Sequence, residues 1–209
     1  MLVIMAIQNI PSQGRLGDLI QNVVFGGVDS EAYGEKIIAD YRSRYQEEGE
    51  QALGEDGAFA ESWNWEYSET VEGTVLPLER ALSGMTRCLI VCRSREYYLG
   101  GAHGMREKQY FLFDTVKNRK ISLDDLIRKN ARMTLRQILA GKLRELAEIG
   151  KDAPLSQGGF LTDLPEIPEN FFLTSGGFGV HWDPYEIAPY VMGPIEVIIP
   201  YDELMSVLR

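Results

Sequence analysis

The sequence has few of the side chains from which metal and catalytic sites are usually built. Its 209 residues include two histidines and two cysteines, and neither histidine stands at a spacing typical of a zinc site. The sequence contains no nucleophile elbow, no Walker A loop and no G-x-G-x-x-G loop. We therefore expect no catalytic residues, no metal site and no cofactor, and a protein that is not an enzyme.

Long apolar runs are absent too. The best ones, Met1–Ile7 and Cys88–Cys92, fall far short of the roughly 18 residues that a membrane span needs, so no transmembrane segment is predicted. The residues between Cys88 and Cys92 favour a strand, which separates the two Cα atoms by about 13 Å, too far for a disulfide. The cysteines therefore neither support nor exclude an oxidising compartment.

Basic residues are scarce in the first part of the chain. Residues 1–84 hold 5 Lys and Arg against 15 Asp and Glu, whereas residues 85–209 hold 16 of each, and the whole chain has a net charge of −10. This balance argues against nucleic acid as a partner, because affinity for phosphates depends on Lys and Arg. It equally argues against an anionic lipid surface. A cationic partner fits, and so does a solvated acidic face without a partner.

Strand patterns precede and follow the helix patterns instead of alternating with them, which predicts an α+β fold. We expect a mixed, largely antiparallel sheet with helices packed on one face. We also expect an acidic N-terminal subdomain, 1–84, and a C-terminal subdomain, 85–209, within one compact unit. Turns are expected at Glu72-Gly73 and at 175–177. The expected strands cover 2–10, 63–71, 85–99, 108–116, 170–174, 178–182 and 194–200. The expected helices begin near 31, 123 and 201; Ser122 and Asp125 are expected to cap the second of them, which is expected to break near Asn130.

Two aromatic patterns stand in the acidic part. Tyr33, Ile37, Tyr41 and Tyr45 recur at steps of four, which is typical of the buried face of an amphipathic helix. Trp63, Trp65 and Tyr67 alternate with polar residues, so that they share one face of a strand. The second pattern has two interpretations, a sheet core or an exposed platform on which a sugar stacks.

The two histidines lie in the most unusual local strings. His103 follows Gly100 and Gly101 in GGAHG, where the glycines predict a sharp turn or bulge after a strand. His181 and Asp183 are two residues apart, so that on a strand they share a face. The pair is compatible with a hydrolase dyad or with a purely structural contact, and a hydrolase would also need a nucleophile.

These strings together resemble a known family. YYLGGAHG, FDTVKNRKISLDDLI and NFFLTSGGFGVHWDPYEIAPYVMGPIEVIIPYDEL are similar to the bacterial RsiV-like domain. That domain forms the C-terminal part of the lysozyme-sensing anti-sigma-V factor, and it also occurs in a peptidoglycan deacetylase and in lipoproteins. The similarity is densest over 97–127 and 171–204, and residues 1–84 resemble more loosely the region that usually precedes it.

The resemblance implies an α+β domain outside the cytoplasm, periplasmic or lipid-anchored, with a leader encoded upstream of Met1. It carries over neither signalling nor deacetylation, because the anti-sigma segment and the metal-ligand histidines have no counterpart in this sequence. What remains is a non-catalytic binding or sensor domain for a cationic protein such as lysozyme or for cell-wall material. The alternative is a glycan-binding accessory module of a cell-wall enzyme. The candidate binding residues are Gly100, Gly101, His103, His181, Tyr185, Glu186 and Tyr190.

Overall fold

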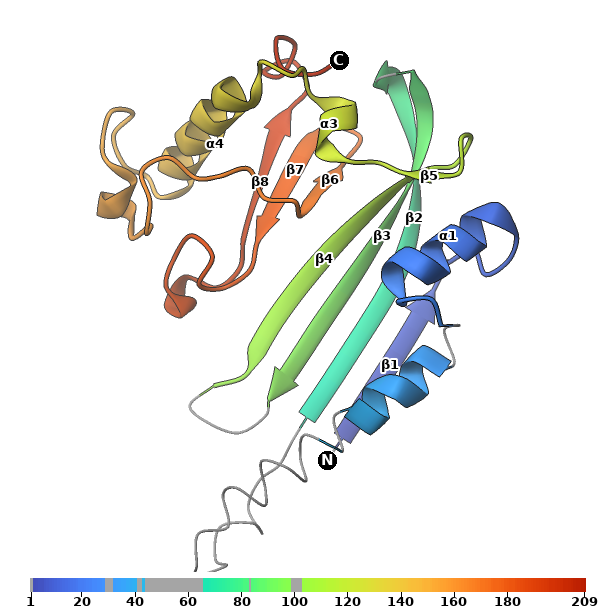
Figure 1. Ribbon diagram of the computed structural model, residues 1–209. Helices are drawn as coiled ribbons and strands as arrows, with labels where there is room; N and C mark the ends of the chain where they lie inside the picture. Colours follow the sequence, from blue (N-terminus) through green and yellow to red (C-terminus); the bar gives the residue numbers. More distant parts are fainter. Residues whose placement is uncertain (1, 29–31, 41–42, 44–65, 83, 99–102) are drawn as a thin grey trace, which may run out of the picture. The chain divides into compact units, whose positions relative to one another are not determined.

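The computed structural model describes residues 2–28, 32–40, 43, 66–82, 84–98 and 103–209, and it divides into two compact units (Figure 1). Unit 1 comprises 1–72 and 94–106, and unit 2 comprises 73–93 and 107–209. Three strands, β2, β3 and β4, each continue from one unit into the other. The division into subdomains 1–84 and 85–209 stays a prediction.

The architecture is α+β, as expected, with two sheets. The strand order is β1-β2-β3-β4-β5 in the larger sheet and β6-β7-β8 in the smaller one. The strands are β1 Leu2–Gln8, β2 Glu66–Leu82, β3 Met85–Tyr98, β4 Met105–Asp114, β5 Arg119–Lys120, β6 Phe171–Leu173, β7 Gly177–Trp182 and β8 Ile195–Pro200. The helices are α1 Gly14–Val24, α3 Leu123–Leu126, α4 Arg132–Leu146 and the 3-10 turns η2 Leu155–Gly158 and η3 Tyr190–Met192, and residues 32–40 are also helical.

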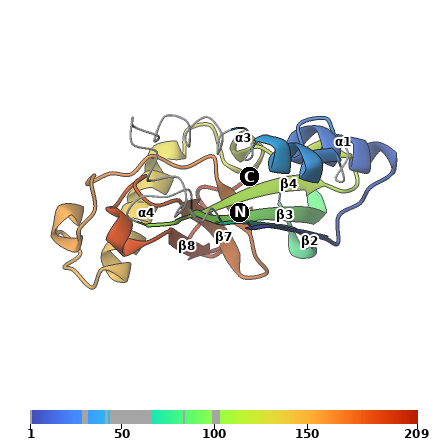
Figure 2. The ribbon, with the colours of Figure 1, turned by 90° about the horizontal axis from the view of Figure 1, so that it is seen from below.

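Unit 1 pairs β1 with β2 in parallel, from Leu2 opposite Glu66 to Gln8 opposite Glu72. Figure 2 shows α1 and the helical residues 32–40 on the same side of these strands. Sequence reasoning missed α1, which buries Gly17, Ile20 and Val24. Gly17 belongs to this packing because a Cβ there would lie 2.7 Å from the carbonyl carbon of Ser12.

The turn expected at Glu72-Gly73 is wrong, because β2 runs without interruption from Glu66 to Leu82. The positive φ that favours glycine in a turn occurs instead at Gly84, between β2 and β3, where φ is 77°. The strand 85–99 is confirmed as β3. Of the aromatic helix face, Tyr33 is buried, whereas Tyr41 and Tyr45 lie outside the described residues.

Unit 2 contains the smaller sheet, in which all strand pairs are antiparallel, and α4, which contacts β8 (Figure 1). The predicted hairpin is confirmed: Thr174 joins its ends, since its N–H donates to the carbonyl of Gly177 at 2.9 Å. The inner face of β7 and β8 and the apolar face of α4 form one core, which includes Leu135, Leu139, Leu143, Phe178, Val180, Trp182, Val197 and Ile199.

The expected helix at 201–208 is wrong. This segment forms successive hydrogen-bonded turns, and the N–H groups of Val207 and Leu208 both donate to the carbonyl of Leu204. The break expected near Asn130 is confirmed, since α3 ends at Leu126 and α4 begins at Arg132. None of the helices in the described ranges is long and apolar enough to cross a membrane.

Candidate functional site

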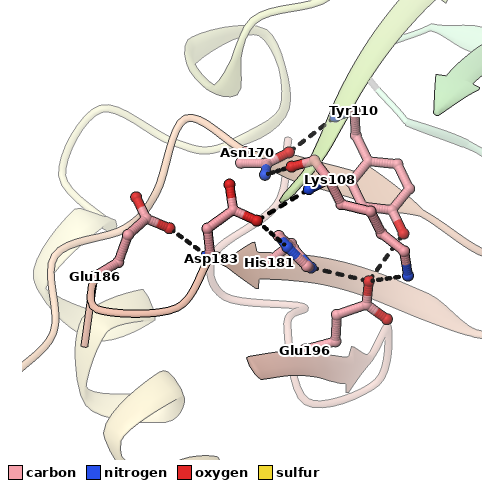
Figure 3. A network of polar contacts seen from close by, with 7 residues as sticks. All are labelled: Lys108, Tyr110, Asn170, His181, Asp183, Glu186 and Glu196. Atoms are coloured by element: carbon pink, nitrogen blue, oxygen red, sulfur yellow. Dashed lines mark hydrogen bonds and ion pairs between the residues drawn. The ribbon is translucent and has the colours of Figure 1, made fainter. Parts of the chain in front are cut away.

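The candidate site lies in unit 2, where His181 of β7 meets side chains from β4, β8 and the loop after β7 (Figure 3). His181 is 1% exposed. Its Nδ1 lies 3.0 Å from Oε1 of Glu196, and its Nε2 lies 2.9 Å from Oδ1 of Asp183. Each ring nitrogen of His181 therefore contacts a carboxylate oxygen.

Strand register brings these residues together. His181 is directly opposite Glu196 in the β7–β8 pair, so that both side chains project from the face of the sheet opposite the α4 core. Asp183 follows His181 at a spacing of two and reaches the same ring. The sequence predicted the contact between His181 and Asp183, whereas Glu196 was missed. Its signal is a single acidic residue in the otherwise apolar PIEVIIP.

Three side chains contact one carboxylate oxygen of Glu196. Besides His181, its Oε1 accepts from Nζ of Lys108 at 3.1 Å and from the hydroxyl of Tyr110 at 2.9 Å. Burial opposes ionisation of Glu196, but the hydrogen bonds from Lys108 and Tyr110 outweigh it and lower its pKa. Burial, together with Cys92 and Glu196, raises the pKa of Tyr110, so that the phenol stays a donor.

Asp183 and Asn170 attach the backbone of β4 to the smaller sheet. Oδ1 of Asp183 accepts from the N–H of Lys108 at 2.9 Å. The amide of Asn170 accepts from the N–H of Tyr110 at 2.9 Å and donates to the carbonyl of Lys108 at 2.6 Å, as a neighbouring strand would (Figure 3). These bonds fix the end of β7, from which the next loop starts.

The loop 183–194 that follows is tightly constrained. The N–H of Asp183 donates to Oε2 of Glu186 at 2.6 Å, and the N–H of Tyr185 donates to the carbonyl of Ala188 at 3.1 Å. Tyr185 has a φ of 75°, a conformation that residues other than glycine rarely adopt. A defined backbone therefore presents the side chains of this loop.

These side chains are largely apolar and exposed. Tyr185 is 54% exposed and Val191 is 89% exposed, and the rings of Tyr185 and Tyr190 lie 5.7 Å apart. Leu161, 64% exposed, adjoins them because its N–H donates to the carbonyl of Ile187 at 2.8 Å. We call the set the apolar surface; its members are Leu161, Tyr185, Tyr190, Val191 and Met192.

The segment that carries this surface is acidic. Residues 152–208 contain nine Asp and Glu and no Lys or Arg. The net charge of 85–209 is nevertheless zero, because the basic residues of that part all lie in 85–151 or at Arg209. Asp163 and Glu186 belong to the same segments as the apolar surface, which places carboxylates beside it.

The structure brings some of the other predicted binding residues together and leaves others apart. Tyr185, Glu186 and Tyr190 come together in the loop 183–194. His103 belongs to unit 1 and is exposed, with its Nδ1 3.1 Å from the carbonyl oxygen of Gly104. Gly100 and Gly101 lie outside the described residues. Sequence reasoning missed Lys108, Tyr110, Asn170 and Leu161, because they join the site through contacts across more than 25 positions of the chain.

The arrangement around His181 bears on the hydrolase interpretation. A general base needs a ring nitrogen whose lone pair is directed at a nucleophile or a water molecule. Here both nitrogens face carboxylates that are themselves held by Lys108, Tyr110 and the backbone. Within the described part of the chain, no three His, Cys, Asp or Glu side chains come together as metal ligands. In this arrangement both ring nitrogens of His181 already have partners within the structure.

The comparisons with known proteins agree with the fold. Residues 124–202 match the model of DUF3298, described as "Protein of unknown function". A crystal structure of a DUF3298 family member from Bacteroides fragilis superposes with a TM-score of 0.69 at 24% identity, covering 93% of this chain and 77% of that one. A DUF3298 family protein from Pseudomonas aeruginosa gives 0.53 at 23% identity, covering 72% and 66%. No curated protein matches.

The class that the fold defines is thus that of an α+β domain similar to DUF3298 proteins. The match of the family model includes β6, β7, β8 and α4, and with them His181, Asp183, Glu196 and the loop 183–194. At 24% and 23% identity, the structural similarity establishes the fold alone. A relation to the RsiV-like domain in particular is part of the proposal that follows.

Proposed function

We propose that this chain is a non-catalytic binding or sensor domain of a bacterial envelope protein, located outside the cytoplasm, and that the apolar surface binds a cationic protein such as a lysozyme. The location and the class of partner follow from the resemblance to the RsiV-like domain. The observation that carries the proposal is the exposure of apolar side chains on a loop whose backbone is fixed.

Exposed apolar side chains that are grouped on one surface mark interaction sites in soluble proteins. Tyr185 and Val191 are both more than half exposed, although the core of unit 2 is well packed. Because the hydrogen bonds of Asp183 and Tyr185 already order the loop, the loop would lose little conformational entropy when a partner binds.

The acidic composition of the segment that carries the surface favours a cationic partner, although Lys108, Arg136 and Lys142 of other segments pair with three of its carboxylates. Residues 152–208 carry nine acidic and no basic side chains, and the chain as a whole has a net charge of −10. Complementary charge accelerates association and makes it sensitive to salt. A basic protein with an apolar recess would match both properties of this surface.

The experiment is titration calorimetry of the full chain with hen egg-white lysozyme at low and at physiological salt. Val191→Ser is expected to weaken binding about tenfold, which is the effect of one buried valine side chain. Val116→Ser is the matched control, because Val116 is 71% exposed in the turn between β4 and β5, away from the loop (Figure 1). Absence of binding at low salt, or equal losses in the two variants, would contradict the proposal.

A second candidate is a glycan-binding accessory module. The observation in its favour is the partly exposed pair Tyr185 and Tyr190, because aromatic rings stack on sugars. Of the pattern at 63–67, Tyr67 is buried and its hydroxyl donates to Glu69, which fits the sheet-core interpretation better than the alternative of a sugar platform. Trp63 and Trp65 lie outside the described residues. Sedimentation of the chain with insoluble peptidoglycan, abolished by Tyr190→Ala, would favour the glycan over the protein.

A further inference from the structure

We propose that His181 is a positioning residue for the loop 183–194, and that its doubly protonated ring holds Asp183 and thereby the shape of the apolar surface. The inference rests on the proposed function for its consequence in binding, whereas the ordering of the loop can be tested by itself. It makes binding to this surface dependent on pH.

The first step is the geometry of the ring. A neutral imidazole carries one N–H and one lone pair, whereas the protonated ring carries two N–H groups. Both ring nitrogens of His181 lie within 3.0 Å of a carboxylate oxygen, and the ring is 1% exposed. Only the doubly protonated ring donates to both carboxylates. After loss of a proton, a lone pair would face an anionic oxygen without water between them.

The second step is the charge around the ring. The elements packed on it contribute Lys108 and Tyr110 from β4, Glu196 from β8 and Asp183 from the loop (Figure 3). Lys108 and a protonated His181 together balance the charges of Asp183 and Glu196. The ring of Tyr110, 6.1 Å from the imidazole, packs edge-on against it, and the Tyr110 hydroxyl donates to Glu196.

The third step leads from Asp183 to the loop. Asp183 accepts from His181 and from the N–H of Lys108, and its own N–H donates to Glu186, whose N–H donates back to the Asp183 carbonyl at 3.2 Å. Tyr185, with a φ of 75°, lies between Asp183 and Glu186, which these two hydrogen bonds connect. A conformation of this kind persists only where the surroundings hold it. Weakening the hold on Asp183 therefore releases the turn that presents Tyr185.

The consequence is a directional pH dependence. Raising the pH removes the second ring proton, loosens the loop and weakens binding to the apolar surface. Return of that proton restores both hydrogen bonds and orders the loop.

The test of loop order uses nuclear magnetic resonance and needs no ligand. The chain has two histidines, so His103→Gln leaves His181 as the single imidazole signal. In this parent, protection of the Asp183 and Lys108 amides should fall as the imidazole signal titrates. His181→Gln should lower their protection about 10- to 100-fold at acid pH, as expected for loss of a hydrogen bond between charged groups, and should remove the pH dependence.

Two further variants keep the inference falsifiable. Asp183→Asn preserves the shape of the side chain and should cause the same loss if His181→Gln does not fold. Glu203→Gln, a carboxylate change in the Lys142 ion pair of the same unit, should leave the loop amides unchanged. Protection of these amides that is independent of pH in the parent, or unaltered in both His181→Gln and Asp183→Asn, would overturn the inference.

Measuring lysozyme binding at several pH values distinguishes a failure of this inference from a failure of the proposed function. With hen lysozyme as the probe, affinity at constant salt should fall with rising pH for the parent but not for His181→Gln, relative to Glu203→Gln. Binding with the same pH profile in the parent and His181→Gln would overturn the role of His181 and leave the proposed function standing. Ordered, pH-dependent loop amides without lysozyme binding would support the role of His181 and count against the proposed partner.

Discussion

Phe172 of β6 and Gly179 of β7 are directly opposite each other, and the ring of Phe172 occupies the space that a Cβ at Gly179 would need. The same ring stacks on Tyr110 of β4, with ring centroids 4.4 Å apart. The glycine therefore determines how closely Tyr110, a member of the candidate site, approaches the smaller sheet. Gly179 is therefore required for this packing.

Replacing Gly179 with Ala should destabilise unit 2 by about 1–3 kcal/mol, the usual cost of overpacking a filled core. The measurement is urea unfolding followed by circular dichroism. Gly176→Ala is the matched control, because a Cβ there meets no atom within 4 Å, and it should change stability by less than about 0.5 kcal/mol. Equal effects of the two substitutions would show that Phe172 yields to the added methyl group.

Glu196 gives a pH dependence of stability whose sign follows from its lowered pKa. A carboxyl whose pKa is lower in the folded than in the unfolded state stabilises the fold at a pH above its unfolded value, here 4.5. That contribution is lost as the pH falls through the folded pKa. Because the side chain is 36% exposed, solvent screening limits the contribution to about 1 kcal/mol.

Glu196→Gln should therefore be less stable than the wild type at neutral pH, and the difference should shrink as the pH falls below 4.5. Urea unfolding at a series of pH values measures it. Glu203→Gln is again the control, since Glu203 shares Lys142 with Glu145 and has no contact with His181 in the described structure. A difference that grows towards acid pH would contradict the assignment.

Local sequence patterns predicted those strands, turns and caps that depend on residues close together in the sequence. The long apolar β3 and the Ser175-Gly176-Gly177 hairpin followed from alternation and turn residues, and the Ser122-Asp125 cap was predicted from its spacing. The helix α1 was missed; its Gly17 is where the helix packs against the backbone of Ser12.

The candidate site was only half predictable for a different reason. His181 and Asp183 are close in sequence, and their common face follows from the period of a strand. Glu196 and Lys108 reach the same ring through register and through packing of β4, which depend on the whole fold. Of the apolar surface, Tyr185 and Tyr190 were predicted as binding residues. Leu161 and Val191 were missed, because their exposure depends on how the core of the whole fold is packed.

Unit 1 has its own buried polar cluster around Glu69, which is 0% exposed. Its carboxylate accepts from the hydroxyl groups of Tyr33, at 3.1 Å, and Tyr67, and it lies 3.7 Å from Nε of Arg95. Tyr33→Phe keeps the edge-on contact with Phe25 but removes one donor. We expect a loss of about 1–2 kcal/mol, seen as faster amide exchange in the helical residues 32–40. Unchanged exchange there would show that Tyr67 and Arg95 suffice for Glu69.

Neither Cys88 nor Cys92 forms a disulfide, and Cys88 is buried. Burial, assisted by the charge of Asp114, raises the pKa of the Cys88 thiol to about 11. At about pH 8 only roughly one thiol in a thousand is then ionised, and the thiolate is the reactive form. In the native protein Cys88 should therefore resist iodoacetamide, whereas both cysteines should react in urea. Mass spectrometry of the labelled peptides distinguishes the two sites, and rapid native labelling of Cys88 at that pH would show that unit 2 opens around β3.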